Sequence, residues 1–176
     1  MTYKQAIDTA LKLIDSEYDE FDEGLYPFYA DTAQKMIAMY GKHIERLKTI
    51  EKPDNTEVEV ELDNFYKLNY TVIRGSKAQV NYILTGNKLT TDSAGTVDIY
   101  YFAMPETVTG ETDDEYQFEV DIETHNAIPY YIGYALAKSD DPATAQMLFN
   151  EWNRYMSVFV DEPKVVVKKM RNVLGR

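Results

Sequence analysis

Thr96-Val-Asp-Ile-Tyr-Tyr-Phe102 is a run of β-branched and aromatic residues typical of a strand, and it opens the stretch that decides the fold. Met104-Pro105 ends this run, and an acidic segment follows at Glu111-Thr-Asp-Asp-Glu115. The apolar residues then change to helical spacing, first around Ala127-Ile-Pro-Tyr-Tyr131 and again after Asp140-Asp-Pro142. This stretch therefore predicts a strand followed by two helices.

The two helices of this stretch differ in pattern. The first is aromatic around much of its circumference, and Pro129 is expected to bend it or to shorten its start, because Pro lacks an amide donor. We expect this helix to be buried on several sides. Asp141 is placed to cap the second helix and Pro142 to occupy its first turn. The inward face of the second helix is predicted to contain Ala145, Leu148, Phe149, Trp152, Tyr155 and Phe159.

Two more helices are predicted in the first fifty residues. Thr2 and Gln5 match a capping box, in which both side chains satisfy open amides of a first turn. The second helix is expected to begin near Tyr26-Pro27 and to extend to Leu47. The apolar stripes are Tyr3, Ile7, Ala10, Leu11, Ile14 and Tyr18 in the first helix and Tyr29, Ala33, Met36, Ile37, Tyr40, Ile44 and Leu47 in the second.

A β module is predicted between the two helix pairs. After Lys52-Pro53 the apolar residues alternate with polar ones, as Val58, Val60 and Leu62 do with glutamates. The same alternation recurs at 66–72 and 80–84. Gly86-Asn87 suits a tight hairpin, because both residues tolerate a positive φ. Four or five short antiparallel strands with tight turns predict a small sandwich or barrel.

The predicted fold class is thus α+β: a helical bundle with an inserted antiparallel β module and an extended C-terminal arm. The expected divisions are the N-terminal helices of the bundle at residues 1–52, the β module at 53–110, the C-terminal helices of the bundle at 111–160 and a basic arm at 161–176.

The composition is that of a folded protein. A chain of 176 residues can bury roughly 70% of its unfolded surface, and 44% of these residues are hydrophobic. The absence of Cys excludes disulfides, thiolate metal sites and a Cys nucleophile. The chain begins with a polar helix rather than a signal segment, and no apolar run approaches the roughly 20 residues that cross a bilayer. We therefore expect assembly in the cytoplasm and no membrane partner.

The net charge of −12 disfavours a tight grip on nucleic acid, because affinity for phosphates comes mainly from Lys and Arg. One interpretation is a solvated acidic surface, and the other is an acidic wall that repels DNA so that it can slide past. Acidic residues cluster between the two N-terminal helices, at Asp15, Glu17, Asp19, Glu20, Asp22 and Glu23. A solvated loop and a calcium site are the alternative interpretations of this cluster.

The C-terminal segment reverses the charge. From Lys164 onward it contains basic residues and no acidic one, beside the β-prone run Val165-Val-Val167. A frayed or internally packed terminus is one interpretation. The other is that this arm adds to a sheet of a neighbouring subunit or partner, with basic side chains setting the register. The predicted partner-binding residues are Lys164, Val165, Val166, Val167, Lys168, Lys169, Met170, Arg171 and Val173.

The sequence lacks the common catalytic and nucleotide-binding motifs, including Gly-x-Ser-x-Gly, Gly-x-x-x-x-Gly-Lys-Ser/Thr and Gly-x-Gly-x-x-Gly. His43 and His125 are its two imidazoles. In Asp121-Ile-Glu-Thr-His125 the Glu and the His are two residues apart and would point to different sides of a helix. Asp113-Asp-Glu115 lacks the ligand spacing of a calcium loop. We predict no catalytic, cofactor-binding or metal-ligating residues, no cofactor and no enzymatic activity.

The segment from about Val58 to Phe159 resembles the head-to-tail adaptor (head-completion or neck) proteins of tailed bacteriophages. The resemblance rests on the order of five elements along the chain rather than on any one motif. These elements are the strand Val97-Asp-Ile-Tyr-Tyr101, the turn Met104-Pro105, the acidic segment Asp113 to Glu115, the helix with Ala127-Ile-Pro-Tyr-Tyr131, and the helix that begins at Asp140-Asp-Pro142. The N-terminal helix pair is similar in pattern and order alone.

This resemblance implies a structural protein of the virion neck, at the head–tail junction. Such adaptors form a ring, commonly of twelve copies, beneath the portal protein and present a surface to the next neck or tail completion protein. DNA would pass through the lumen without sequence-specific binding. The resemblance further implies that the C-terminal arm docks on the portal, that the helices form the ring wall, and that the β module is peripheral or faces the tail.

Two other functions remain open from the residues themselves. A carbohydrate-binding module is suggested by aromatic residues on a small sheet, namely Tyr66, Tyr70, Tyr82, Tyr100 and Tyr101. The same residues alternate as core residues would. A metal-assisted hydrolase could use His43 or His125 with nearby carboxylates.

Overall fold

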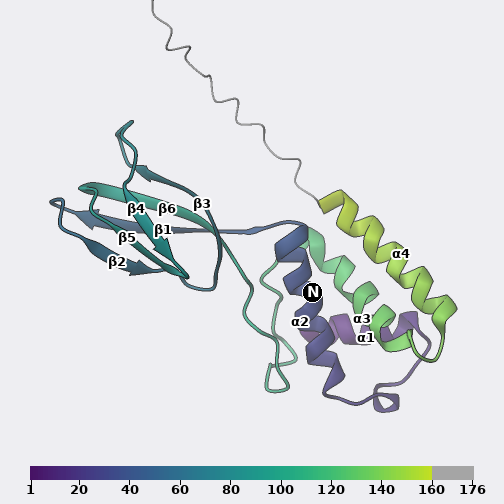
Figure 1. The fold of residues 1–176 in the computed structure, drawn as a ribbon. Coiled ribbons are helices and arrows are strands. Elements are labelled where there is room, and N and C mark those ends of the chain that lie inside the picture. The colour runs from purple at the N-terminus through teal and green to yellow at the C-terminus, as the bar shows by residue number, and fades with distance from the viewer. Residues whose placement is uncertain (160–176) are drawn as a thin grey trace, which may run out of the picture.

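The computed structural model describes residues 1–159, which form a helical body and a β lobe joined by two chain segments (Figure 1). The helical body contains α1 (Tyr3–Leu13), α2 (Leu25–Tyr40), α3 (Ile128–Ala137) and α4 (Pro142–Phe159), with short 3-10 turns at Tyr18–Glu20 and Ile122–Ala127. The β lobe contains β1 (Ile44–Lys52), β2 (Val58–Glu61), β3 (Phe65–Ile73), β4 (Tyr82–Thr85), β5 (Lys88–Thr91) and β6 (Gly95–Ala103). The α+β class and the insertion of the β lobe between the second and third helices are confirmed.

Helix α3 is the central helix of the body and contacts α1, α2 and α4. Its side chains Ile128 and Ile132 are fully buried. Gly133 permits the close approach of its neighbours, because a Cβ there would lie 3.0 Å from Cδ1 of Leu148 and 3.5 Å from the carbonyl oxygen of Ala10. The expected burial of this helix on several sides is therefore confirmed.

Both predicted N-terminal caps are present. The Gln5 amide donates to Oγ1 of Thr2 at 3.3 Å, and the Thr2 amide donates to Oε1 of Gln5 at 3.0 Å, which completes the capping box of α1. At α4, Oδ1 of Asp141 accepts hydrogen bonds from the amides of Ala143 and Thr144 at 3.2 and 3.1 Å. These bonds fix where the two helices begin.

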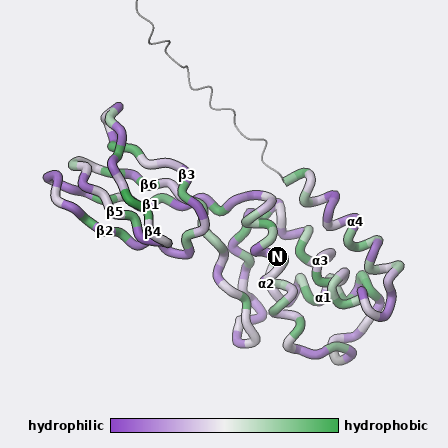
Figure 2. Tube along the Cα trace, in the orientation of Figure 1, coloured by the Kyte–Doolittle hydropathy of each residue, from purple (hydrophilic) through white to green (hydrophobic). Residues whose placement is uncertain are grey.

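The β lobe consists of two antiparallel three-stranded sheets with strand orders β1-β6-β3 and β2-β5-β4. Each strand carries both hydrophilic and hydrophobic residues (Figure 2), and the apolar sides of the two sheets share one core. Gly86, at φ +61°, and Asn87 form the expected two-residue hairpin between β4 and β5. The lobe is therefore a small sandwich, one of the two predicted alternatives, with six strands rather than the expected four or five. Its buried core residues are Leu62, Val80, Leu89, Val97, Ile99, Tyr101 and Ala103.

The predicted extension of the second helix to Leu47 is wrong. Helix α2 ends at Tyr40, and the backbone amide of Gly41 donates to the carbonyl of Ile37 at 2.9 Å. The next element is β1, in which every second residue from Ile44 is partly or fully buried. Three of those positions are basic, Arg46, Lys48 and Lys52, and long basic side chains with aliphatic stems hide the alternation from the sequence pattern. The β lobe therefore begins at residue 44 rather than 53.

The other boundary of the β lobe also differs from the prediction, because the chain leaves the lobe after Ala103 rather than at 110. The following segment packs on the helical body, where Gln34 Nε2 donates to the carbonyl of Glu106 at 2.6 Å. The apolar residues of this segment are too widely spaced to show a period, which is why the sequence pattern did not assign them to the core. The residues of this segment buried in the body are Val108, Phe118 and Val120.

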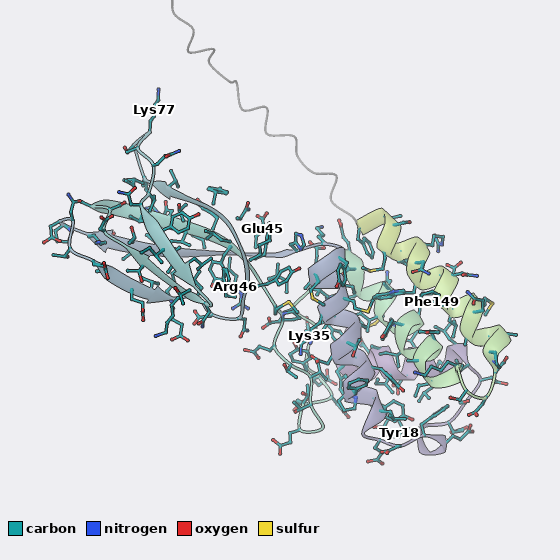
Figure 3. The ribbon with its side chains drawn as sticks, in the orientation of Figure 1. Tyr18, Lys35, Glu45, Arg46, Lys77 and Phe149 are labelled. Atoms are coloured by element: carbon teal, nitrogen blue, oxygen red, sulfur yellow. The ribbon has the colours of Figure 1, made fainter. Side chains whose placement is uncertain are left out.

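Polar contacts fix the junction between the two lobes. Arg46 lies at the base of β1 (Figure 3), and its Nη2 pairs with the carboxylate of Glu119 at 3.2 Å. Lys42, in the connection from α2 to β1, pairs with Asp121 at 2.8 Å and with Glu123 at 3.1 Å. The lobe is therefore attached through paired charges as well as through the chain.

Candidate functional site: an aromatic face and a free sheet edge on the β lobe

The two histidines are engaged in hydrogen bonds. Nε2 of His125 lies 2.9 Å from the carbonyl of Val120, and its Nδ1 lies 3.0 Å from the amino group of Met1. A carbonyl can only accept, so Nε2 carries the hydrogen and Nδ1 accepts from the ammonium group. Nδ1 of His43 lies 2.6 Å from the carbonyl of Ala38. Within residues 1–159, no group of three or more His, Asp and Glu residues could hold a metal ion.

In the two acidic segments, at residues 15–23 and 111–115, Asp carboxylates accept hydrogen bonds from nearby backbone amides. Oδ1 of Asp22 accepts from the amide of Gly24 at 2.9 Å, and Oδ1 of Asp113 accepts from the amide of Glu115 at 2.7 Å. Such bonds are typical of turns with an Asp at the first position. Both segments therefore match the loop interpretation in the part of the chain that the structure describes.

The outer side of the β1-β6-β3 sheet carries large apolar side chains, and we call it the aromatic face. Along β1 and β6 its residues alternate with those of the sandwich core, so they point away from the β2-β5-β4 sheet. Two of them are strongly exposed, with 51% of Tyr70 and 50% of Leu47 open to solvent. The aromatic face consists of Leu47 on β1, Tyr66 and Tyr70 on β3, and Tyr100 and Phe102 on β6.

The centre of the aromatic face is a cross-strand cluster. Tyr100 lies opposite Leu47 in the β1–β6 register and opposite Tyr70 in the β3–β6 register. The rings of Tyr70 and Tyr100 stack with centroids 4.3 Å apart. Desolvation of the Tyr70 hydroxyl raises its pKa, and the neighbouring Tyr100 raises it further. At the end nearer the helical body, the ring of Phe102 lies 4.5 Å from that of His43. The face is thus a continuous, preformed surface across three strands.

Register shifts in β3 explain why the sequence pattern did not reveal this face. The shifts lie between Phe65 and Lys67 and between Leu68 and Tyr70. They break the simple alternation, so Leu68 packs on the sandwich core while Tyr70 joins the aromatic face. The two positions were predicted to share one side of a strand, and this prediction is wrong.

A charged group, Asp98, borders the aromatic face on β6, two residues before Tyr100. Asp98 is buried, and its carboxylate accepts hydrogen bonds from Nε of Arg74 at 2.9 Å, from Nη2 of Arg74 at 2.7 Å and from Oγ1 of Thr49 at 2.8 Å. The bonds from Arg74 and Thr49 lower the pKa of Asp98. The bidentate pair links the end of β3 to β6, because Arg74 directly follows β3.

We expect Asp98→Asn to lower the midpoint of urea unfolding at pH 7. The folded state depresses the pKa of Asp98, so its stabilising effect is present at neutral pH and is lost as the pH falls through the folded pKa. The difference in midpoint between wild type and variant should therefore shrink below about pH 4. Glu45→Gln, on the exposed side of β1, is the control. A difference that stays constant down to pH 3 would contradict this role of the carboxylate.

Among the strands at residues 1–159, β4 is an edge of the second sheet, since it pairs with β5 alone in the order β2-β5-β4. All four of its residues are exposed, including 68% of Ile83 and 45% of Tyr82. A shallow depression of about 310 Å³ adjoins this edge. It is lined by Glu57, Asn81, Tyr82, Ile83, Thr90, Thr91 and Asp92.

The tyrosines proposed as a sugar-binding platform do not form one surface. Tyr101 is buried in the sandwich core, and Tyr82 lies on the other sheet. Tyr66, Tyr70 and Tyr100 do share the aromatic face. The sequence reasoning missed Leu47 and Phe102 as members of this face, although the alternation in β6 could have identified Phe102.

The predicted partner-binding arm, Lys164 to Val173, lies outside the described residues. Among the helices at residues 1–159, none is both long and apolar enough to cross a membrane. Comparison of the sequence with protein-family models and with curated proteins found no match for this chain.

Proposed function

We propose that this protein is a structural assembly protein, a head-to-tail adaptor of a tailed bacteriophage that forms a ring beneath the portal. The observation that carries the proposal is the exposed apolar surface on a lobe that projects from a helical body (Figure 1). Large exposed apolar patches on folded proteins mark interaction sites. The choice of a phage adaptor among interaction proteins rests on the order of elements along the chain, which resembles that of the adaptors.

The aromatic face has the chemistry of a protein interface. Tyr and Phe are enriched at interface cores, and Tyr70 and Tyr100 are held in place by their stacking, so little side-chain entropy is lost on binding. We assign this face to the next neck or tail completion protein, and the helices to the ring wall. Copies that meet through a heterologous contact form a closed ring when the rotation between successive copies adds up to a full turn.

The acidic character of the chain fits passage of DNA through the ring. Repulsion between carboxylates and phosphates disfavours binding of DNA to the wall, so DNA would pass without sequence-specific contacts. In this proposal the protein is assembled in the host cytoplasm and remains in the neck of the virion, without a cofactor or an enzymatic activity.

The stacking of the tyrosines also weighs against a carbohydrate platform. A sugar ring packs on an open aromatic face, whereas Tyr70 and Tyr100 turn faces toward each other, with an interplanar angle of 18°. The stack leaves their edges and hydroxyl groups for a partner. This arrangement favours a protein contact over the sugar.

The proposal is tested by mixing the full-length protein with its cognate portal and examining the mixture by negative-stain microscopy. Rings bound to the base of the portal are the expected result. Free portals at micromolar protein, with the protein folded by circular dichroism, would overturn the adaptor function.

The aromatic face is tested by Tyr70→Ser in the same assembly, with binding of the downstream neck protein as the readout. We expect about 30-fold weaker binding, the effect of removing an interface hot spot worth about 2 kcal/mol. Asn69→Ser is the matched control, because Asn69 is an exposed polar neighbour on the same strand. Equal binding by the two variants would remove the face from the interface.

A further inference from the structure

Strand β4 differs from the other edge strands of the β lobe in carrying no charge. The sequence of β4 is Tyr82-Ile-Leu-Thr85, whereas β2, at the opposite edge of the same sheet, is Val58-Glu-Val-Glu61. In the other sheet β1 carries several charged residues, and β3 carries Lys67 together with two register shifts. Charges and bulges are among the devices that keep edge strands from pairing with other chains. Among the strands at residues 1–159, β4 is thus the edge that lacks them.

The edge strand β4 is also held ready to pair. The hydroxyl of Thr91 donates to the carbonyl of Asn81 at 2.6 Å, and the amide of Asn81 donates to Oγ of Ser93 at 2.9 Å. These bonds fix the residue that precedes β4, while the hairpin at Gly86 fixes its other end. In an antiparallel ladder alternate residues of an edge strand turn their backbone groups outward. The strand is therefore a rigid template for one more strand.

The surroundings of β4 select a basic partner. The depression beside Tyr82 and Ile83 is lined by two carboxylates, Glu57 and Asp92, and by no Lys or Arg. Neither carboxylate forms an ion pair within the described residues. Apolar side chains flanked by free carboxylates are complementary to an apolar strand flanked by Lys.

The C-terminal arm of the chain has this sequence. Its Val165-Val-Val167 run has high β propensity and is bounded by Lys164 on one side and Lys168-Lys169 on the other. The arm follows α4, whose last residue, Phe159, packs beside Gly41 at the junction of the two lobes. The five residues between Phe159 and Val165 can extend by about 17 Å. The valines can thus lie beyond the molecule that carries them.

We propose that β4 of one copy binds the arm of a neighbouring copy, in which Lys164 to Lys169 add a fourth strand to the β2-β5-β4 sheet. Backbone hydrogen bonds supply the affinity, and Glu57 and Asp92 attract the lysines. The choice of a neighbouring copy rests on the proposed ring, in which copies stand side by side. The arm then holds the ring together, and the portal is contacted by another surface.

The test is disulfide trapping between two full-length variants, which is clean because the chain has no Cys. One variant carries Ile83→Cys, and the other carries Val165→Cys, Val166→Cys or Val167→Cys in turn. Paired strands bring Cα atoms to about 4.5–5.5 Å, which is within the range for a disulfide. After mixing and mild oxidation, we expect mixed dimers between the two variants, identified by mass spectrometry, with one arm position favoured by the register.

The matched control is Glu59→Cys. Glu59 and Ile83 both lie opposite Thr90, so the two positions are on the same side of the sheet but at opposite edges. Mixed dimers should form about tenfold more with Ile83→Cys than with Glu59→Cys. In a second experiment, the substitutions Glu57→Lys and Asp92→Lys are added to the Ile83→Cys variant. They should lower the yield of mixed dimer, because they reverse the charge beside β4.

Equal trapping at the two edges would overturn the proposal, and so would an absence of mixed dimers up to millimolar protein. The double variant Ile83→Cys/Val166→Cys distinguishes pairing within one chain from pairing between two. An intrachain disulfide without disulfide-linked dimers of this variant would overturn the exchange between copies. These measurements use the protein without portal. Failure here, with portal-bound rings still seen by microscopy, would refute the strand exchange alone, whereas trapped dimers without portal binding would refute the adaptor function alone.

Discussion

Trp152→Ala is expected to lower the free energy of unfolding of the helical body by about 3–5 kcal/mol, the cost of removing a large aromatic side chain from a core. Trp152 on α4 is 1% exposed and packs with its ring centroid 5.1 Å from that of Tyr131 on α3. It belongs to the apolar cluster that joins the helices of the body. Replacement by Ala leaves a cavity beside α3. This helix also packs against α1 and α2, so it cannot move to fill the space.

The loss is measured by urea unfolding followed by circular dichroism at 222 nm. Met147→Ala is the control, because Met147 lies on the same helix and is 56% exposed. Its effect should stay within about 0.5 kcal/mol. A loss below about 1 kcal/mol for Trp152→Ala would show that this side chain is not part of a close-packed core.

Ile99→Ala is expected to destabilise the β lobe by about 2–5 kcal/mol. Ile99 lies in the middle of β6, the central strand of its sheet, and is fully buried in the sandwich core. The helical body has a separate core, and Ile44 is the partly buried residue that packs against both. We therefore expect the variant to unfold in two steps, with the β lobe first.

The single Trp of the chain makes this separation measurable. Trp152 lies in the helical body, so its fluorescence reports on that part alone. Amide hydrogen exchange of β1, β3 and β6 should rise in Ile99→Ala while the fluorescence midpoint stays near the wild-type value. Leu47→Ala, on the exposed side of β1, is the control. Coincident loss of both signals would show that the two lobes unfold as one unit.

A consequence of separate cores is that the β lobe can change without unfolding the body. The surfaces assigned to partners, the aromatic face and the β4 edge, both belong to this lobe. The polar junction pairs, such as Arg46 with Glu119, hold the lobe in place without sharing a large core. Substitutions on these surfaces are therefore expected to leave the helical body folded, and amide hydrogen exchange of β6 checks that the β lobe itself remains folded.

Local sequence signals predicted the elements whose cause is local. The capping box at Thr2, the Asp141 cap and the Gly86 hairpin depend on residues a few positions apart, and all three are present. The helical period of α4 and the alternation of β2 follow from burial of one side of each element. For the same reason the α+β class and the order of the elements, with the β insert between the second and third helices, could be predicted, although the bounds of the insert could not.

Signals that depend on distant neighbours were misread. Ile44 and Leu47 fit a helical stripe, yet pairing with β6 makes them residues on opposite sides of β1. Val108 has no periodic neighbours, and its burial depends on contact with helices far away in the sequence. Such positions are decided by the tertiary partner, which a local pattern does not contain.

The sequence by itself determined the fold class, the four helices with a β insert between the second and third, and the charge contrast between an acidic chain and a basic C-terminal segment. The tertiary structure alone decided which tyrosines meet. Register shifts in β3 turn Tyr70 toward Tyr100, while Tyr101, one residue along, enters the core. It also decided that β4 is an uncharged edge, because the edge of a sheet depends on strand order. Periodicity records which side of a strand is apolar, whereas strand order and register arise from pairing between distant segments.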